Sequence, residues 1–154
     1  MATTYKADAY VNTPYGNTGH GFHKGSVHLH ATSGSISTWA LNDSILMGYL
    51  PANAVVVGVI LKAQGQLDSN GSPAITFDVG ITGTLQLWKA AITTVGRAAT
   101  VTSDSTIATT GGLYKTTAKT AVIVTVHAAA ATAVAGVIEV DIEYYVEDAG
   151  ATAP

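Results

Sequence analysis

Paired histidines are the residues of this sequence whose type and spacing come closest to a chemical site. His28 and His30 form a His-x-His pair, and His20 and His23 precede them. Two neutral imidazoles on one face of a strand can bind a metal ion together. No acidic residue occupies the five positions after His30, and His127 stands far away in a different context. We therefore expect polar side chains on an exposed or interface face here, with no metal or cofactor site.

A metal-dependent β-sandwich enzyme of the cupin type is the alternative that these histidines leave open. Cupin enzymes carry a His-x-His pair followed after a few residues by a glutamate, and a further histidine motif comes later in the chain. Here the residues after His30 read Ala-Thr-Ser-Gly-Ser, and the later motif is missing. This alternative ranks last among the functions we consider.

Carboxylates are concentrated near the end of the chain. Five of the ten acidic residues are Glu139, Asp141, Glu143, Glu147 and Asp148. A calcium site usually takes its ligands from loops that bend around the ion. Carboxylates at alternate positions of a straight strand instead repel one another. We expect a solvated face, and a docking face for a basic partner is the alternative.

The sequence shows no recognisable set of residues for acid–base or nucleophilic catalysis. Asp43, Asp68, Asp78 and Asp104 stand singly in expected turns or strands. Acid–base chemistry needs two such groups on either side of a cleft. The sequence also contains no Gly-x-Ser-x-Gly elbow and no phosphate-binding loop. We expect no catalytic residue and a protein that is not an enzyme.

Three aromatic residues, Trp39, Trp88 and Tyr114, could stack on sugars as in a carbohydrate-binding module. Aromatic residues make up only 7% of the chain, however, and large rings are the main material of a core. We expect these three side chains to pack inside the protein.

The composition bounds the class of protein. Only 11% of the 154 residues are charged, against roughly 25% in an ordinary soluble domain. A surface of Thr, Ser, Asn and Gly loses little charge solvation on contact with other protein, which hints at assembly. The net charge is −3 and the basic residues are spread singly, so nucleic-acid binding has no electrostatic footprint. With no cysteine, disulfides and thiolate metal sites are excluded.

The elements that must position these groups are strands. Residues 137–146 alternate apolar side chains with Glu139, Asp141 and Glu143, which is typical of a strand with one face on a core. Residues 120–127 precede it, and an alanine-rich turn connects the two. We expect a hairpin in the core rather than a membrane span, although residues 121–138 approach the length of a spanning helix.

Short segments rich in β-branched residues recur along the whole chain, with almost no helical periodicity. Residues 84–94 fit either a helix or a strand, and strand character is weak near 100–102 and 105–108. The other predicted strands are residues 25–32, 36–41, 45–50, 54–62, 75–81, 113–117, 120–127 and 137–146. This spacing predicts an all-β fold, an antiparallel β-sandwich that is jelly-roll-like. We expect an extended N-terminal arm at 1–24, the sandwich domain at 25–148 and a flexible tail at 149–154.

The segment from Leu41 to Val146 resembles small virion proteins of tailed bacteriophages. The resemblance rests on three features in order: the run Ala-Leu-Asn-Asp-Ser-Ile-Leu-Met-Gly-Tyr-Leu-Pro at 40–51 before Ala-Val-Val-Val at 54–57, the strand Ile-Thr-Phe-Asp-Val-Gly at 75–80, and the closing pair at 121–126 and 136–146. These features are strand patterns and a Leu-Pro turn, not a site.

Such proteins decorate or cement the capsid and are often trimeric. The resemblance therefore implies a capsid decoration protein on the virion surface, made in the host cytoplasm. Its partners would be the major capsid protein and further copies of itself, with no nucleic acid and no membrane. A receptor- or glycan-binding knob of a phage tail or fibre is the alternative function.

Overall fold

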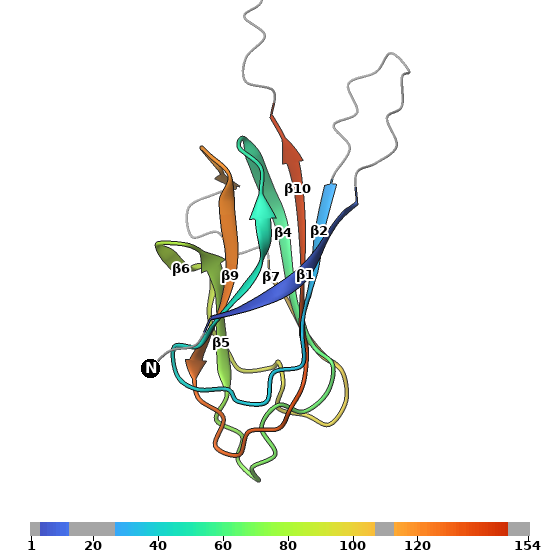
Figure 1. Cartoon of the computed structure of the whole chain (residues 1–154), viewed down its shortest axis with the longest axis vertical. Helices are drawn as coiled ribbons and strands as arrows, with labels where there is room; N and C mark the ends of the chain where they lie inside the picture. The colour runs from blue at the N-terminus through green and yellow to red at the C-terminus, as the bar shows by residue number, and fades with distance from the viewer. Residues whose placement is uncertain (1–3, 13–26, 107–112, 148–154) are drawn as a thin grey trace, which may run out of the picture.

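A computed structural model describes residues 4–12, 27–106 and 113–147 of the protein. These residues form ten strands and no helix, arranged as two sheets packed face to face (Figure 1). The strands are β1 (Thr4–Asn12), β2 (Val27–Ser33), β3 (Ser44–Leu50), β4 (Ala54–Ala63), β5 (Thr76–Ile81), β6 (Thr84–Ile92), β7 (Thr102–Thr106), β8 (Tyr114–Lys115), β9 (Thr120–Ala128) and β10 (Ile138–Val146).

The order of the strands confirms the predicted fold class. One sheet, the β3 sheet, runs β6–β5–β9–β3, and the other, the β2 sheet, runs β2–β10–β4–β7. β8 pairs with the edge of β4 beyond the part that β7 occupies. Neighbouring strands in both sheets are antiparallel, and the chain repeatedly steps from one sheet to the other, as in a jelly roll.

β1 connects the two sheets along one side of the sandwich. Its first residues, Thr4 to Lys6, pair parallel with β3, and the rest, Ala7 to Asn12, pair antiparallel with β2. We expect an extended arm over residues 1–24, and this part of it is an extended strand that pairs within its own chain. The remainder of the expected arm and the expected tail at 149–154 lie outside the described residues.

The core forms where the inward faces of the two sheets meet. β9 contributes Val122, Val124 and Val126, and β10 contributes every second residue from Ile138 to Tyr144. Burial of these side chains removes apolar surface from water at about 25 cal/mol per Å². The alternation expected over 137–146 is therefore confirmed, with the carboxylates on the outer face.

The expected hairpin of residues 120–127 with 137–146 is wrong. β9 pairs with β3 and β5, whereas β10 pairs with β2 and β4, so the two strands lie in opposite sheets. Their apolar rows face the same core from two sides. An alternating pattern specifies which face is buried, but it does not distinguish a strand's partner from a strand across the core.

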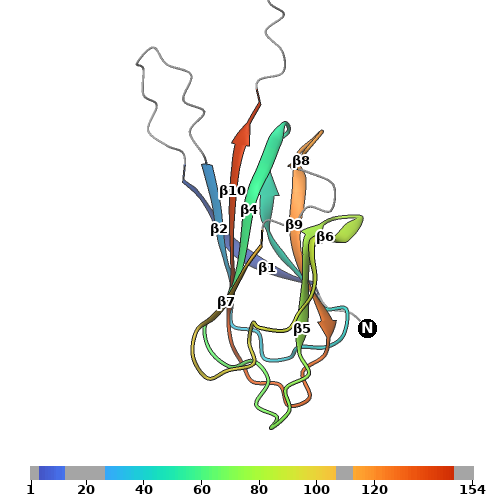
Figure 2. The ribbon, with the colours of Figure 1, turned by 180° about the vertical axis from the view of Figure 1, so that it is seen from behind.

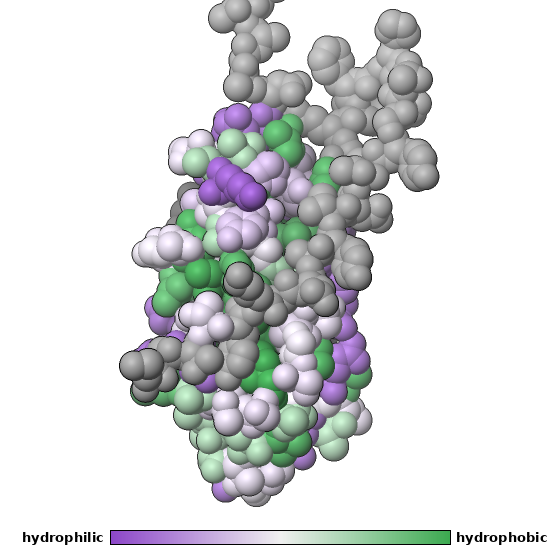
Figure 3. All heavy atoms as spheres, in the orientation of Figure 1, coloured by the Kyte–Doolittle hydropathy of each residue, from purple (hydrophilic) through white to green (hydrophobic). Residues whose placement is uncertain are grey.

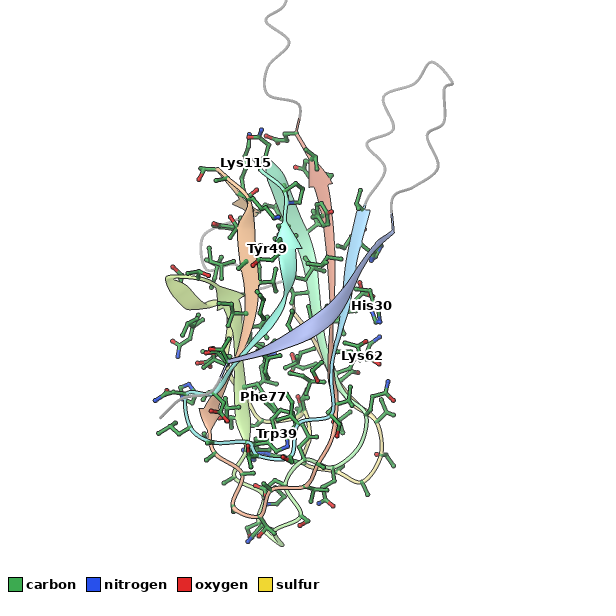
Figure 4. The ribbon with its side chains drawn as sticks, viewed as in Figure 1. His30, Trp39, Tyr49, Lys62, Phe77 and Lys115 are labelled. Carbon is green, nitrogen blue, oxygen red and sulfur yellow. The ribbon has the colours of Figure 1, made fainter. Side chains whose placement is uncertain are left out.

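Residues 36–41 form no strand, which corrects a second expectation. Ile36 and Trp39 are buried three positions apart, so the segment does not follow a strand's period of two. The ring of Trp39 meets that of Phe77 edge to face, with centroids 5.8 Å apart (Figure 4). Its indole N–H donates to the carbonyl of Val134, 2.8 Å away. Residues 84–92, which the sequence left open between helix and strand, form β6.

Four connectors meet at one end of the sandwich, here called the loop end: β2–β3, β4–β5, β6–β7 and β9–β10 (Figure 2). The buried carboxylate of Asp68 links two of them, because it accepts five backbone N–H groups at 2.8–3.2 Å. The donors lie in the β4–β5 and β9–β10 connectors, at Asn70, Ala74, Ile75, Ala131 and Thr132. Each hydrogen bond to the charged carboxylate is stronger than one between neutral groups.

Within the described residues, no helical segment has the length and apolar character to cross a bilayer.

The charge of Asp68 makes this linkage depend on pH. Burial acts to raise its pKa, but the backbone N–H groups, led by that of Thr132, outweigh burial and hold the pKa well below its ordinary value of 3.8. The unfolded chain therefore takes up this proton before the folded chain does. The stabilisation is fully present above about pH 4 and is lost as the pH falls through the lower folded-state pKa.

Asp68→Asn should lower the free energy of unfolding at pH 7 by about 2–4 kcal/mol, because an amide NH2 then faces backbone donors. Urea denaturation at pH 7 and at pH 3.5 measures the loss, which should be smaller at the lower pH. Asp141→Asn is the matched control, since Asp141 is partly exposed with a single imidazole partner, and should cost under about 1 kcal/mol. Equal losses for both variants would contradict the assigned role of Asp68.

Candidate interaction surfaces

The histidine pair lies on the outer face of β2, as expected. His28 Nδ1 is 3.1 Å from Asp141 Oδ1 on the neighbouring strand β10, and His30 pairs in register with the same aspartate. Among the described residues, no group of three or more His, Cys, Asp or Glu side chains could hold a metal ion. His20 and His23 lie outside the described residues.

The acidic face of β10 is a mixed surface rather than a run of bare carboxylates. Glu139 lies opposite Lys62 of β4 and accepts a hydrogen bond from Gln64, and Glu143 lies opposite His28 of β2. Figure 4 shows His30 and Lys62 along this side of the molecule. Each of the three carboxylates on this face is half-buried. Neighbouring cationic or polar groups thus offset their repulsion, and Asp148 lies outside the described residues.

The aromatic residues considered for sugar stacking pack inside the protein. Trp39 and Trp88 are 2% and 3% exposed, and Tyr114 is half-buried against Trp88 with ring centroids 6.2 Å apart. A ring that is covered on both faces has no surface left for a sugar. The expectation of core packing is confirmed for the two tryptophans, and Tyr114 packs against the edge of the core.

The end opposite the loop end, here called the hairpin end, carries an apolar hollow. The hollow is a cavity of about 420 Å³ between the two sheets, and its lining residues are Tyr49, Leu50, Pro51, Ala52, Lys119 and Tyr144. Lys119 Nζ stands 4.6 Å from the centre of the Tyr49 ring, in a cation–π contact. Burial raises the pKa of Tyr144.

Exposed apolar side chains gather at this hairpin end. Tyr49 is 48% exposed, Leu113 is 54% exposed and Val146 is 43% exposed. Val146 pairs with the first residue of β4, next to the β3–β4 turn. Leu113 directly precedes β8, which pairs with Val55 and Val56, so it lies further along β4 from the turn. Figure 3 shows strongly hydrophilic side chains beside apolar ones at this end, where Lys115 also forms an ion pair with Glu147. Exposed apolar side chains beside a hollow favour contact with another protein.

A second hollow lies on the outer face of the β3 sheet, where β6 folds over β5. The register between the two strands breaks, and residues 85–88 bulge out of the pairing. Gly80 permits this arrangement, since a Cβ on it would lie 2.2 Å from the carbonyl oxygen of Thr84. The resulting cavity has a volume of about 490 Å³, and its lining residues are Asn42, Asp78, Thr84, Leu85, Gln86, Thr125 and His127.

A hydrogen-bonded group of side chains forms the floor of this cavity. Asp78 Oδ2 lies 2.9 Å from both Gln86 Nε2 and His127 Nδ1, and Asp78 Oδ1 accepts the backbone N–H of Ala91 at 2.7 Å. The register of β9 against β5 shifts beside His127, which is the kind of irregularity that re-aims a side chain. The sequence does not reveal the hydrogen-bond partners of Asp78, because they lie 8, 13 and 49 positions away along the chain.

The other single aspartates also have structural partners. Asp43 Oδ2 accepts the backbone N–H of Ala40 at the start of β3. Asp104 accepts from the ammonium of Lys89 and from the hydroxyl of Thr94. These contacts connect the loop segments to the strands beside them.

Solved phage capsid structures contain chains similar to this one. A chain of the cyanophage Pam1 capsid asymmetric unit is 31% identical, with a TM-score of 0.71 over 88% of this chain and 94% of that chain. A chain of the capsid of Ralstonia phage GP4 is 28% identical, with a TM-score of 0.66 over 90% and 92%. A chain of the acidic stable capsid of Helicobacter pylori bacteriophage KHP30 shares the fold at 15% identity, with a TM-score of 0.54 over 77% and 87%. No protein-family model and no curated protein matches the chain.

The jelly-roll fold and these comparisons define a bacteriophage virion protein with a structural role. The chain belongs to the family represented by its relative in the cyanophage Pam1 capsid structure. The resemblance to phage virion proteins that the sequence indicates is thereby confirmed.

Gly80→Ala should destabilise the protein by at least about 2 kcal/mol, because its new methyl group meets backbone rather than a flexible side chain. Thermal unfolding measures the loss. Gly34→Ala is the control, since a Cβ there meets nothing within 4 Å. Equal unfolding temperatures for the two variants would show that the close approach of β6 to Gly80 does not contribute to stability.

Proposed function

We propose that the protein is a capsid decoration, or cement, protein, which binds the outside of the capsid lattice and stabilises it. The observation that carries the proposal is the similarity to chains of two phage capsid structures over nearly the full length of all three chains. A protein that ties subunits together needs a stiff body and a sufficient interface rather than a reactive site. About 800 Å² per partner is the usual scale of such an interface.

The described structure fits this mechanical role. The connectors at the loop end are tied by Asp68 and by backbone bonds such as Leu67 N–H to Gly96 O at 2.8 Å and Ile36 N–H to Gly136 O at 2.9 Å. A body held in this way can transmit force between two contacts without bending. Its low charge also limits the cost of desolvation on binding.

The hairpin end is the surface that we assign to the major capsid protein. Tyr49, Leu113 and Val146 expose apolar area there, and the hollow beside Tyr49 can receive an apolar side chain. Aromatic side chains set in partly formed pockets contribute most of the binding energy in protein interfaces. The loop end also exposes Leu41 and Val101, but its connectors bond to one another, and the apolar hollow beside Tyr49 lies at the opposite end.

Further copies of the chain are the second partner in this proposal. A homotrimer would match the local three-fold positions of a capsid lattice, and closed symmetry is the rule for such assemblies. Sedimentation of the free protein and of the particle-bound protein tests this part of the proposal separately from capsid binding.

Purified protein added to particles that lack it should bind to their outer surface and raise the temperature at which they release DNA. Electron microscopy locates the protein and a dye-release melt measures the stabilisation. Location on the tail, or binding without stabilisation, would contradict the cement role and would favour the alternative of a receptor-binding knob.

Tyr49→Asp and Leu113→Asp should each weaken binding to such particles about tenfold or more, since each places a charge in a desolvated apolar contact. Val101→Asp is the matched control, because it also places a charge on an exposed apolar side chain. Val101 is 64% exposed and lies in the β6–β7 connector at the loop end. Circular dichroism verifies that all three variants fold. A loss in the control but not in the other two would assign the contact to the loop end.

A further inference from the structure

The cavity under β6 combines a buried negative charge with unused hydrogen-bond acceptors. The side chain of Asp78 is 5% exposed, whereas that of His127 is 42% exposed and reaches the solvent. Neither lysine nor arginine is among the described residues that line the cavity. The electrostatic field inside a partly enclosed polar hollow of this kind favours a cation.

The hydrogen bonds fix where the proton of His127 stands. An ionised carboxylate can only accept, so the ring nitrogen that faces Asp78 at 2.9 Å, Nδ1, carries the hydrogen. Gln86 Nε2 also donates to Asp78, and its 3.4 Å approach to His127 Nδ1 therefore joins two donors and is no hydrogen bond. In the neutral imidazole, Nε2 is then an acceptor, and it has no hydrogen-bond partner among the residues that the structure describes.

Thr125 gives an independent sign of a missing ligand. This residue lies between Asp78 on β5 and Ser44 on β3, is 4% exposed, and lines the cavity. Its hydroxyl oxygen has no hydrogen-bond partner within the described part of the chain, as is also true of the Thr76 hydroxyl and the Trp88 indole nitrogen, neither of which lines the cavity. A buried polar atom without a partner costs about 1–3 kcal/mol, and such atoms are uncommon in folded proteins.

We propose that this cavity binds a basic side chain, the ammonium of a lysine or the guanidinium of an arginine, from a neighbouring virion protein. The negative charge of Asp78 attracts the cation and His127 Nε2 accepts its hydrogen bond, and the Thr125 hydroxyl becomes a further acceptor when its side chain turns toward the cavity. A cation of this kind has several donors and no acceptor, which matches a site of free acceptors around a carboxylate. The identity of the neighbour rests on the proposed function, whereas the chemistry of the site does not.

Other ligands fit the cavity less well. A phosphate or carboxylate would face the charge of Asp78. A divalent metal ion would have only two strong ligands here, Asp78 and His127, and these two side chains already bond to each other. A sugar offers neutral hydroxyls that gain less than a cation does from the buried charge.

Titration of the full-length protein with N-acetyl-lysine amide and N-acetyl-arginine amide tests the site, with the His127 ring protons followed by NMR. At least one probe should shift the His127 signals saturably in the millimolar range. His28 is an internal reference, since it pairs with Asp141 beside a much smaller hollow, and it should shift less than His127 and without saturation. N-acetyl-glutamate amide and a panel of disaccharides serve as negative probes.

Thr125→Val should weaken binding of the active probe about threefold or more while preserving the shape of the core, and Asp78→Asn should abolish saturation. Asp141→Asn is the matched control and should leave binding at His127 unchanged. Equal shifts at His28 and His127, or saturation by a negative probe instead, would overturn the proposal. Failure of the protein to bind particles, with the probe still bound at His127, would contradict the proposed function and leave the site intact.

Discussion

The packing of two alternating faces against each other is the constraint on which the rest of the structure depends. In both sheets the inward residues are apolar and lie in one cluster, from Leu29 on β2 to Ile142 on β10. Because the side-chain period of a strand is two, a slip of one residue would move a whole row into water. The register of every strand, and with it the position of each outward group, follows from this burial.

The two ends of the sandwich differ in how their connectors are stabilised. At the loop end, the carboxylate of Asp68 replaces the partners that several backbone N–H groups lack in irregular segments. At the hairpin end, the turn between β3 and β4 is short, and apolar side chains such as Tyr49 remain in contact with solvent. The backbone of the loop end is thus satisfied within the chain, whereas the hairpin end keeps an apolar hollow beside Tyr49.

The outer face of the β3 sheet shows how a rigid fold can carry a specific contact. Gly80 lacks a side chain, so β6 can lie across β5 and enclose Asp78 together with His127. The groups involved come from three strands and are held by backbone pairing rather than by flexible loops. A site built on strands keeps its geometry when the body as a whole is under load.

The sequence by itself determined which residues of the last strand face inward, because the alternation over 137–146 matches the burial of β10. The alternation over 75–81 did not do so, since both faces of β5 are buried. The sequence also indicated the all-β class and the likeness to phage virion proteins. Only the tertiary structure decided that β9 and β10 lie in opposite sheets, that Asp68 ties two connectors, and that Asp78 meets His127. Pairing across long sequence separations leaves no periodic signal, since the same pattern satisfies any partner that covers the apolar face.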